Sequence, residues 1–344
     1  MKRLKILYSG HSFDFSAPGD RRRIIRWAAA KNHEIVTENS SKADVKVITS
    51  SSNLSEVMKE KKSVPIILDL VDAYHVGGSL YSDFLMAIHR SFKHRTWLSK
   101  LSFSNLLDEV MHRVDYIVFS SPEQRNLASM HFNKSTDILD FHDEFPELIY
   151  VPPKKDRLEL FWEGQTTSLR ALSDNIDANS SDLEACVESI NVLTDSSAGV
   201  FFGKFIKTQT EVAFAKLFFS TRVNVHRQDW NLKNVNEVAK KSNLSLVPVL
   251  SDSLNFHKPE NRVLISWRMG LPVLASNTPS HQRLSSATQA NFCVGSDWVE
   301  QIYNLNKNRD LLEEQVFKGK TYLTQHHNTE VILSKWDAIF ARVV

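Results

Sequence analysis

The sequence predicts an α/β protein of two similar halves, each a Rossmann-like parallel sheet covered by helices. Short apolar runs alternate with helical patterns along the chain, which is typical of parallel strands joined by crossover helices. This pattern is interrupted at residues 150–156, which include the only Pro-Pro pair, and then starts again. The length of 344 residues suits two domains of about 150 residues each.

In the first half, the strands are expected where apolar runs are bounded by turn residues. These runs lie at residues 4–8, 45–49, 64–71, 115–120 and 137–141. Asp20 is expected to cap a helix that carries Ile24 and Ile25. Ser121 and Pro122 predict another helix start, with proline at the first helical position.

In the second half the same alternation predicts further strands and helices. Strands are expected at residues 158–162, 198–202, 222–225, 244–250 and 271–275. Helices are expected from Thr167, at 235–241 and at 258–269, where Gly270 ends the helix. The tail at 298–344 is predicted to be helical, with an apolar stripe that includes Trp336 and Phe340.

Composition excludes several function classes. The chain has only 10 glycines, against about 24 at average usage. It contains neither G-x-G-x-x-G nor a P-loop motif, so the phosphate loops of dinucleotide-binding and P-loop proteins have no basis here. With 42 Lys and Arg against 40 Asp and Glu, the charge balance gives no basis for nucleic-acid binding. Its two cysteines, Cys186 and Cys293, favour a reducing compartment.

The chain is expected to be cytoplasmic, with one segment that suits the inner face of a membrane. No window approaches the roughly 18 apolar residues of a spanning helix, and the start lacks the apolar stretch of a signal peptide. Residues 88–103 interleave basic and aromatic side chains. This composition is typical of a peripheral membrane helix, but a core helix with extended basic side chains is the default interpretation, and the membrane helix stays open as the alternative.

The most informative segment, residues 242–279, predicts a phosphate site. A strand and a polar loop precede a helix whose expected first turn holds Lys258, Asn261 and Arg262. Helix N-termini attract phosphate through unpaired N–H groups and the helix dipole. The alternative is a surface helix whose basic side chains lie in solvent.

This segment resembles the donor-binding region of GT-B glycosyltransferases, especially the family-4-like group. KPENR at 258–262 and WRMGLPVLAS at 267–276 are similar to a helix that begins K-x-x-N-[KR] and ends at a G-x-P-V-[VL]-A-[ST] strand. DYIVFSSPEQ at 115–124 is similar to the family's A-D-x-I-[IV]-x-x-S passage. The resemblance implies two Rossmann-like domains that face a cleft. The acceptor domain is expected at 1–152, the donor domain at 153–325, and a C-terminal helix at 326–344 that packs back on the first domain.

The resemblance also implies the residues that bind the nucleotide-sugar donor. The glycine loop after the strand at 158–162, the region around Trp230 and the helix start after residue 256 correspond to its donor contacts. The implied set is Gly164, Gln165, Thr166, Arg227, Trp230, His257, Lys258, Pro259, Glu260, Asn261 and Arg262. The family's E-x7-E carboxylates are absent, because His257 and Ile265 occupy those positions.

On the acceptor side, two groups of residues follow expected strands. Asp72 and His75 are candidates to polarise an acceptor hydroxyl or contact the sugar, and the alternative is that the aspartates cap turns. Around the first loop the acceptor-binding candidates are Gly10, His11, Gly19, Arg21 and Arg22. Arg21 and Arg22 belong to a group of four arginines with Arg23 and Arg26, which could bind a phosphate or an anionic acceptor or could form a solvated helix face. A strand face with Asp140, His142 and Glu144 is expected to be a polar edge rather than a metal site.

The sequence thus predicts a hexosyltransferase-like enzyme of polysaccharide biosynthesis. It would move a sugar from a UDP- or GDP-linked donor to a glycan or lipid-linked acceptor, with retention if the family-4 likeness holds. No D-x-D occurs, which argues against the metal-dependent glycosyltransferase fold. Neither a metal nor another cofactor is expected. Lys258, with Asp72 and His75, is expected in catalysis. The alternatives are an inverting transferase or nucleotide-sugar epimerase of the same fold, and a non-catalytic sugar- or nucleotide-binding subunit.

Overall fold

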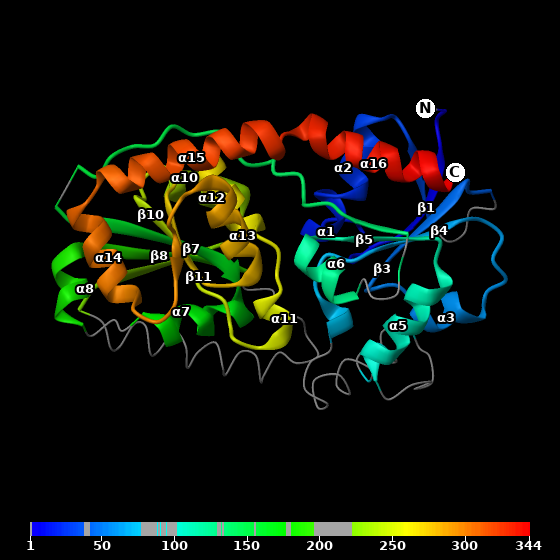
Figure 1. Cartoon of the computed structure of the whole chain (residues 1–344), viewed down its shortest axis with the longest axis horizontal. Helices are drawn as coiled ribbons and strands as arrows, with labels where there is room; N and C mark the ends of the chain where they lie inside the picture. The colour runs from blue at the N-terminus through cyan, green and yellow to red at the C-terminus, as the bar shows by residue number, and fades with distance from the viewer. Residues whose placement is uncertain are drawn as a thin grey trace. The chain divides into compact units, whose positions relative to one another are not determined.

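The computed structural model describes residues 2–37, 42–76, 88, 90, 94, 102–128, 132, 134–154, 156–176, 180–195 and 222–344. These residues form two compact units, each described by itself below (Figure 1). Unit 1 comprises Met1–His142, Asp252–Pro259 and Asn328–Val344, and unit 2 comprises Asp143–Ser251 and Glu260–His327. The expected strand at 198–202 and most of the segment 88–103 lie outside the described residues.

Unit 1 is built on a six-stranded sheet in which every pair is parallel, in the order β2-β1-β3-β4-β5-β6. The strands are β1 (Lys5–Ser9), β2 (Glu34–Val36), β3 (Val45–Thr49), β4 (Ile66–Asp69), β5 (Tyr116–Phe119) and β6 (Ser135–Asp137). The helices of its first part are α1 (Pro18–Arg21), α2 (Ile24–Ala30), α3 (Leu54–Lys59), α5 (Phe103–Arg113) and α6 (Pro122–Ala128), with a 3₁₀ turn η1 at Tyr74–Val76. Two further helices, α11 (Ser253–Phe256) and α16 (Thr329–Val343), come from later in the chain.

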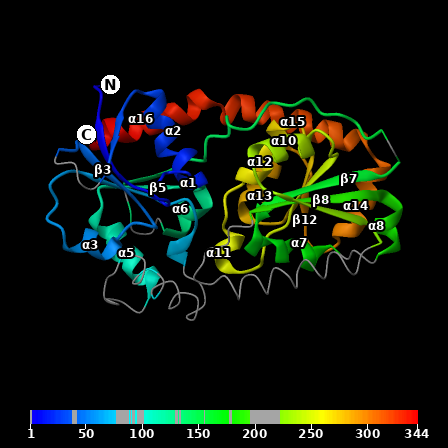
Figure 2. The ribbon, with the colours of Figure 1, turned by 180° about the vertical axis from the view of Figure 1, so that it is seen from behind.

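Alternating side chains of unit 1's strands fill two cores, one on each face of the sheet. Ile67 and Val118 pack with α2 and α16 on one face, and Leu68 and Phe119 pack with α3 and α5 on the other. Both views place α2 beside α16 and, across the sheet, α3 beside α5 (Figures 1 and 2). Trp336, Ile339 and Phe340 of α16 are buried in the first core, so the expected return of the C-terminal helix to the first domain is confirmed.

Unit 2 repeats the design with a parallel sheet in the order β12-β11-β10-β7-β8-β9. Its strands are β7 (Leu158–Gln165), β8 (Val187–Asp195), β9 (Asn224–Asp229), β10 (Leu244–Val247), β11 (Val273–Ser276) and β12 (Cys293–Val294). Its helices are α7 (Leu169–Asn175), α8 (Ser181–Cys186), α10 (Leu232–Ala239), α12 (Asn261–Arg268), α13 (Pro279–Thr288), α14 (Trp298–Lys307) and α15 (Asp310–His326), with a 3₁₀ turn η2 at Thr166–Ser168.

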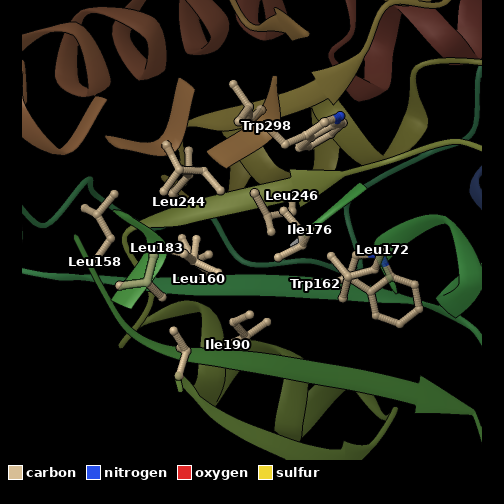
Figure 3. Close-up of a cluster of buried hydrophobic side chains, with 14 of the residues drawn as sticks. Leu158, Leu160, Trp162, Leu172, Ile176, Leu183, Ile190, Leu244, Leu246 and Trp298 are labelled. Atoms are coloured by element: carbon tan, nitrogen blue, oxygen red, sulfur yellow. The ribbon is translucent and has the colours of Figure 1, made fainter. Parts of the chain in front are cut away.

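The strands of unit 2 also bury side chains on both faces. Leu158, Leu160 and Trp162 of β7 point into one core, where Trp162 lies next to Leu172 of α7 (Figure 3). Phe161 lies between them in sequence and packs into the opposite core with α10 and α12. The predicted α/β class with two Rossmann-like domains is confirmed.

Three local predictions are wrong. The strand expected at 137–141 ends at Asp137, because the chain then turns away and the Phe141 N–H donates to the Arg22 carbonyl. The helix expected at 258–269 begins later than expected: α12 runs from Asn261 to Arg268, and α11, which ends at Phe256, is a separate helix before it. Asp20 caps no helix and is instead a buried residue within α1. Gly270 does end α12 as expected, at a φ of 73°.

Candidate functional site

In unit 2, Arg262 occupies the carboxyl edge of the sheet. It lies in the first turn of α12, and its guanidinium donates to the main-chain carbonyls of Glu163, at 3.0 Å, and Pro248, at 3.4 Å. These carbonyls belong to the end of β7 and to the residue that follows β10. Burial lowers the pKa of Arg262, while the nearby Glu163 carboxylate raises it. An arginine side chain stays protonated at physiological pH, so Arg262 places a positive charge at this edge of the sheet.

Gly164 leaves the space that the Arg262 guanidinium occupies. A Cβ at position 164 would lie 3.0 Å from the Trp162 ring and 3.2 Å from Nη1 of Arg262. A side chain there would press on the ring or on the cation, so glycine at this position permits the close approach. The structure therefore brings together two predicted donor residues, Gly164 and Arg262.

Trp230 is joined to the same edge through Glu163. Its indole Nε1 donates to Oε2 of Glu163 at 2.8 Å, and its main-chain N–H donates to the Thr194 carbonyl at the end of β8. Gln165 is exposed at the end of β7, and Thr166 begins η2 directly after it. Arg227 is exposed on β9, the edge strand of the sheet.

Glu260 holds the start of α12 to α13. Its carboxylate is fully buried and accepts from Nη2 of Arg283 at 2.6 Å, and it makes no side-chain cap on the helix it precedes. Of the expected first-turn residues, only Asn261 and Arg262 lie in α12, while Lys258 and Pro259 precede it. The eight-residue helix thus presents its N-terminal end without a carboxylate cap.

In unit 1, the loop after β1 is folded around the buried Asp20. One oxygen of this carboxylate accepts from the Tyr8 hydroxyl and the His11 N–H, and the other accepts from the N–H and hydroxyl of Ser12. A Cβ at Gly10 would lie 2.7 Å from the first oxygen. The loop is therefore a preformed structure at the carboxyl end of β1.

His11 and Gly19 meet in this loop. A Cβ at Gly19 would lie 2.8 Å from the His11 ring, whose Nδ1 is 3.2 Å from the Ser51 hydroxyl. Burial lowers the pKa of His11, against the opposing effect of the Asp20 carboxylate. Arg21 donates to the Ser16 carbonyl, and Arg22 follows α1 as its C-cap. Gly10, His11 and Gly19, three predicted acceptor residues, are thus brought together.

The sequence grouped Arg23 with three neighbouring arginines, but the structure separates it from them. It is fully buried and forms ion pairs with Asp69 at 2.6 Å and with Asp140 at 3.2 Å. Burial alone would lower the pKa of Arg23, but these two carboxylates raise it. The buried cluster of Arg23, Asp69 and Asp140 therefore fixes the end of β4, because Asp69 is the last residue of that strand. Asp72 and His75 follow shortly after it.

Asp72 and His75 follow β4. The Tyr74 hydroxyl donates to Asp72 at 3.3 Å, and Nε2 of His75 is 3.0 Å from the Gln124 carbonyl. Because a carbonyl can only accept, Nε2 carries the hydrogen and Nδ1 keeps a lone pair. Burial lowers the pKa of His75 to about 4, so the ring is neutral at physiological pH.

The expected strand face with Asp140, His142 and Glu144 is absent, because these residues lie beyond the end of β6. Asp140 and His142 are both buried. Within the described part of the chain, no group of three or more metal-ligating side chains is found, and no helix is long and apolar enough to span a membrane.

Several solved structures share the fold of the whole chain. Sucrose-phosphate synthase from Thermosynechococcus elongatus matches with a TM-score of 0.70 at 9% identity and covers 99% of both chains. HepE from Anabaena, in complex with UDP and glucose, matches with a TM-score of 0.62 at 9% identity, over 99% of this chain and all of HepE. The chain has the GT-B fold.

Another solved structure matches over a smaller part of both chains. A structure of S. aureus TarM with UDP matches this GT-B chain with a TM-score of 0.55 at 11% identity, over 86% of the chain. The chain spans about half of TarM, since 55% of that structure is covered. No protein-family model and no curated protein matches the sequence.

Sequence reasoning missed several residues that build these sites. Glu163, Arg283 and Gln124 each contact a predicted site residue through a bond to another part of the chain. No local pattern marks such partners, because they are separated from the residues they contact by 23 to 67 positions.

The low pKa of His75 predicts that acid destabilises unit 1. An unfolded histidine titrates near 6.5, whereas the folded one titrates near 4. The unfolded chain therefore binds more protons between these values, and the free energy of unfolding should fall as the pH decreases from 6.5 to 4, by at most about 3 kcal/mol. Urea unfolding at several pH values measures this slope.

The His75→Gln variant should flatten that slope, whereas His226→Gln, at an exposed position on β9, should leave it unchanged. An equal slope in His75→Gln and the parent protein would contradict the assignment.

Proposed function

We propose that this GT-B protein is a metal-independent glycosyltransferase that takes a sugar from a UDP- or GDP-linked donor and transfers it, with retention, to a glycan or lipid-linked acceptor. The observation that supports it most is the position of Arg262, which is held by two carbonyls at the carboxyl edge of unit 2's sheet, in the first turn of α12. Ligands of open α/β sheets bind at this edge. HepE and TarM, which share the fold, were solved with UDP.

The chemistry asks for stabilisation of a departing diphosphate. Arg262 and the N-terminal N–H groups of α12 supply positive charge and hydrogen-bond donors that need no rearrangement during the reaction. Lys258, four residues earlier in the chain, would add a second cation. Gly164 would let the ligand approach the backbone, and the Trp230 ring, oriented by Glu163, would offer an apolar surface.

In unit 1 the neutral His75 would accept a hydrogen bond from a sugar or acceptor hydroxyl through Nδ1. Asp72 precedes it by three residues and would act with it on the acceptor. The preformed loop with Gly10, His11 and Gly19 would shape the acceptor site, with Arg21 and Arg22 nearby in sequence. The role of the region 88–103 in contacting a membrane stays part of the proposal for a lipid-linked acceptor.

A non-catalytic nucleotide- or sugar-binding protein is the second candidate, because the E-x7-E carboxylates of the resembling family are missing. Titration calorimetry with UDP, GDP and their sugars, followed by a donor-hydrolysis assay, separates the two. Binding and hydrolysis of one donor support the transferase. Binding without turnover of any donor, with or without acceptors, supports the second candidate, and absence of binding contradicts both.

Lys258→Ala should lower turnover of the preferred donor by about 100-fold, because removing one preorganised donor to a developing charge typically costs that much. The matched control is Lys233→Ala, since Lys233 is exposed on α10 and pairs only loosely with Glu237, at 4.0 Å. Unchanged donor binding and turnover in Lys258→Ala would remove Lys258 from the site.

A further inference from the structure

Gln124 connects three segments of unit 1. It is fully buried in the first turn of α6. Its side-chain Oε1 accepts from the Ser120 N–H at 3.2 Å, and its Nε2 donates to the His257 carbonyl at 3.1 Å. Its own carbonyl accepts from His75. A buried amide with these partners is well satisfied, and two of them are predicted site residues.

The contact with His75 fixes that ring. Nε2 donates to the Gln124 carbonyl, and the ring packs edge-on against Phe119, with centroids 5.4 Å apart. Nδ1 is buried and has no hydrogen-bond partner among the described residues. The end of α6 nearest the sheet therefore determines which nitrogen His75 offers to a ligand.

The contact with His257 fixes the segment Asp252–Pro259. Inside this segment, Asp252 caps α11 by accepting from Asn255, and Nδ1 of His257 donates to the Ser253 carbonyl at 2.7 Å. These bonds lie within the segment and do not join it to the rest of unit 1. The Gln124 carboxamide instead links the segment to α6, 133 positions away in the chain.

We propose that Gln124 is a positioning residue of the transfer reaction, whose carboxamide holds the segment Asp252–Pro259, and with it Lys258, in place relative to His75. This inference rests on the proposed function. It differs from a purely structural role, in which the carboxamide serves only to satisfy the Ser120 N–H.

Gln124→Glu separates the two roles. The variant keeps the side-chain length and an oxygen that accepts from Ser120, but it has no N–H to donate to the His257 carbonyl. Two oxygens would then face each other where the hydrogen bond was, so the link to the segment should be lost while α6 stays folded. Gln325→Glu is the matched control, because Gln325 is exposed on α15.

Three measurements on the full chain test the proposal. Hydrogen exchange should become at least 10-fold faster in Gln124→Glu for the amides of Phe256 and Lys258, which bond within the segment. Calorimetry should show at least 10-fold weaker binding of the preferred nucleoside diphosphate, UDP or GDP. Kinetics should show a matching rise in the donor KM, and Gln325→Glu should behave as the parent protein in all three.

The results also distinguish failure of this inference from failure of the proposed function. Faster exchange with unchanged nucleotide binding and KM would show that Gln124 is only structural, and unchanged exchange would show that it does not hold the segment. Either result overturns the inference while the transferase stands. No nucleotide binding by the parent protein would overturn the proposed function, and the inference with it.

Discussion

Replacing Gly319 with alanine should lower the free energy of unfolding of the protein by about 2–3 kcal/mol, because the added methyl group has no room. Gly319 lies in α15, and a Cβ there would be 2.2 Å from Cδ2 and 2.5 Å from Cγ of Trp267 in α12. The gain in helix propensity from glycine to alanine is about 1 kcal/mol and does not offset a contact that short.

Trp267 cannot move aside to accept the methyl group. Its indole is fully buried, its Nε1 lies 3.4 Å from Oε1 of Gln315, and Phe292 packs edge-on against it with centroids 5.3 Å apart. The strain must therefore separate α15 from α12, the helix that carries Arg262. Weaker nucleotide binding should accompany the loss of stability.

Urea unfolding followed by tryptophan fluorescence measures the effect. Gly295→Ala is the matched control, because nothing lies within 4 Å of a Cβ at that position, and it should change stability by less than about 0.5 kcal/mol. Equal stability of Gly319→Ala and the parent protein would mean that the two helices are less closely packed than the structure shows.

The strands that the sequence predicted well are those buried on both faces. Ile66–Asp69, Tyr116–Phe119 and Leu244–Val247 are continuous runs of buried residues, and such runs are recognisable because a central parallel strand contacts helices on both sides. The strand Val187–Asp195 went unpredicted, since polar residues interrupt its apolar ones and its burial depends on partners elsewhere in the chain.

Helix ends were harder to predict than helix existence. Lys258 and Pro259 suggested a helix start, because proline is favoured at the first helical position. The helix instead begins after Glu260, whose carboxylate is held by Arg283 of the following helix. That tertiary contact has no counterpart in the local sequence, so the error follows from what a local pattern can contain.

For the candidate site, the sequence predicted glycines near a ligand but not what fills the space beside them. Gly164 was expected in a loop at a strand end, and it instead lies within β7, next to the last residue of that strand and beside Arg262. Gly319 had no expected role, and its reason is Trp267, 52 positions away. A glycine needed for close packing is visible only when both partners are in place.

Removing one carboxylate from the buried cluster around Arg23 should have the largest effect on unit 1. Asp69→Ala should cost about 3–5 kcal/mol of unfolding free energy, because it leaves a buried guanidinium without its main counter-charge. Asp69 accepts from Nε and Nη2 of Arg23 and is fully buried. Asp140 alone, at 3.2 Å from Nη1, cannot replace those two bonds.

The control is Asp174→Ala, which removes the carboxylate of an exposed Arg–Asp pair. Asp174 pairs with Arg170 on the surface of α7, where both side chains are largely exposed, so its loss should cost less than about 1 kcal/mol. Urea unfolding of both variants gives the comparison.

A variant that replaces all three charges with apolar residues, Arg23→Met with Asp69→Leu and Asp140→Leu, tests the cause. If the cost of Asp69→Ala comes from an uncompensated buried charge, the triple variant should be more stable than the single one, since no charge remains to be solvated. A triple variant less stable than Asp69→Ala would show instead that the hydrogen bonds that Arg23 keeps in Asp69→Ala, to Asp140 and to the Ile138 carbonyl, stabilise unit 1 by more than the buried charge costs. Asp72 and His75 lie shortly after the end of β4, where Asp69 pairs with Arg23. Hydrogen exchange of the amides around His75, measured without nucleotide, should therefore become faster as these variants lose stability.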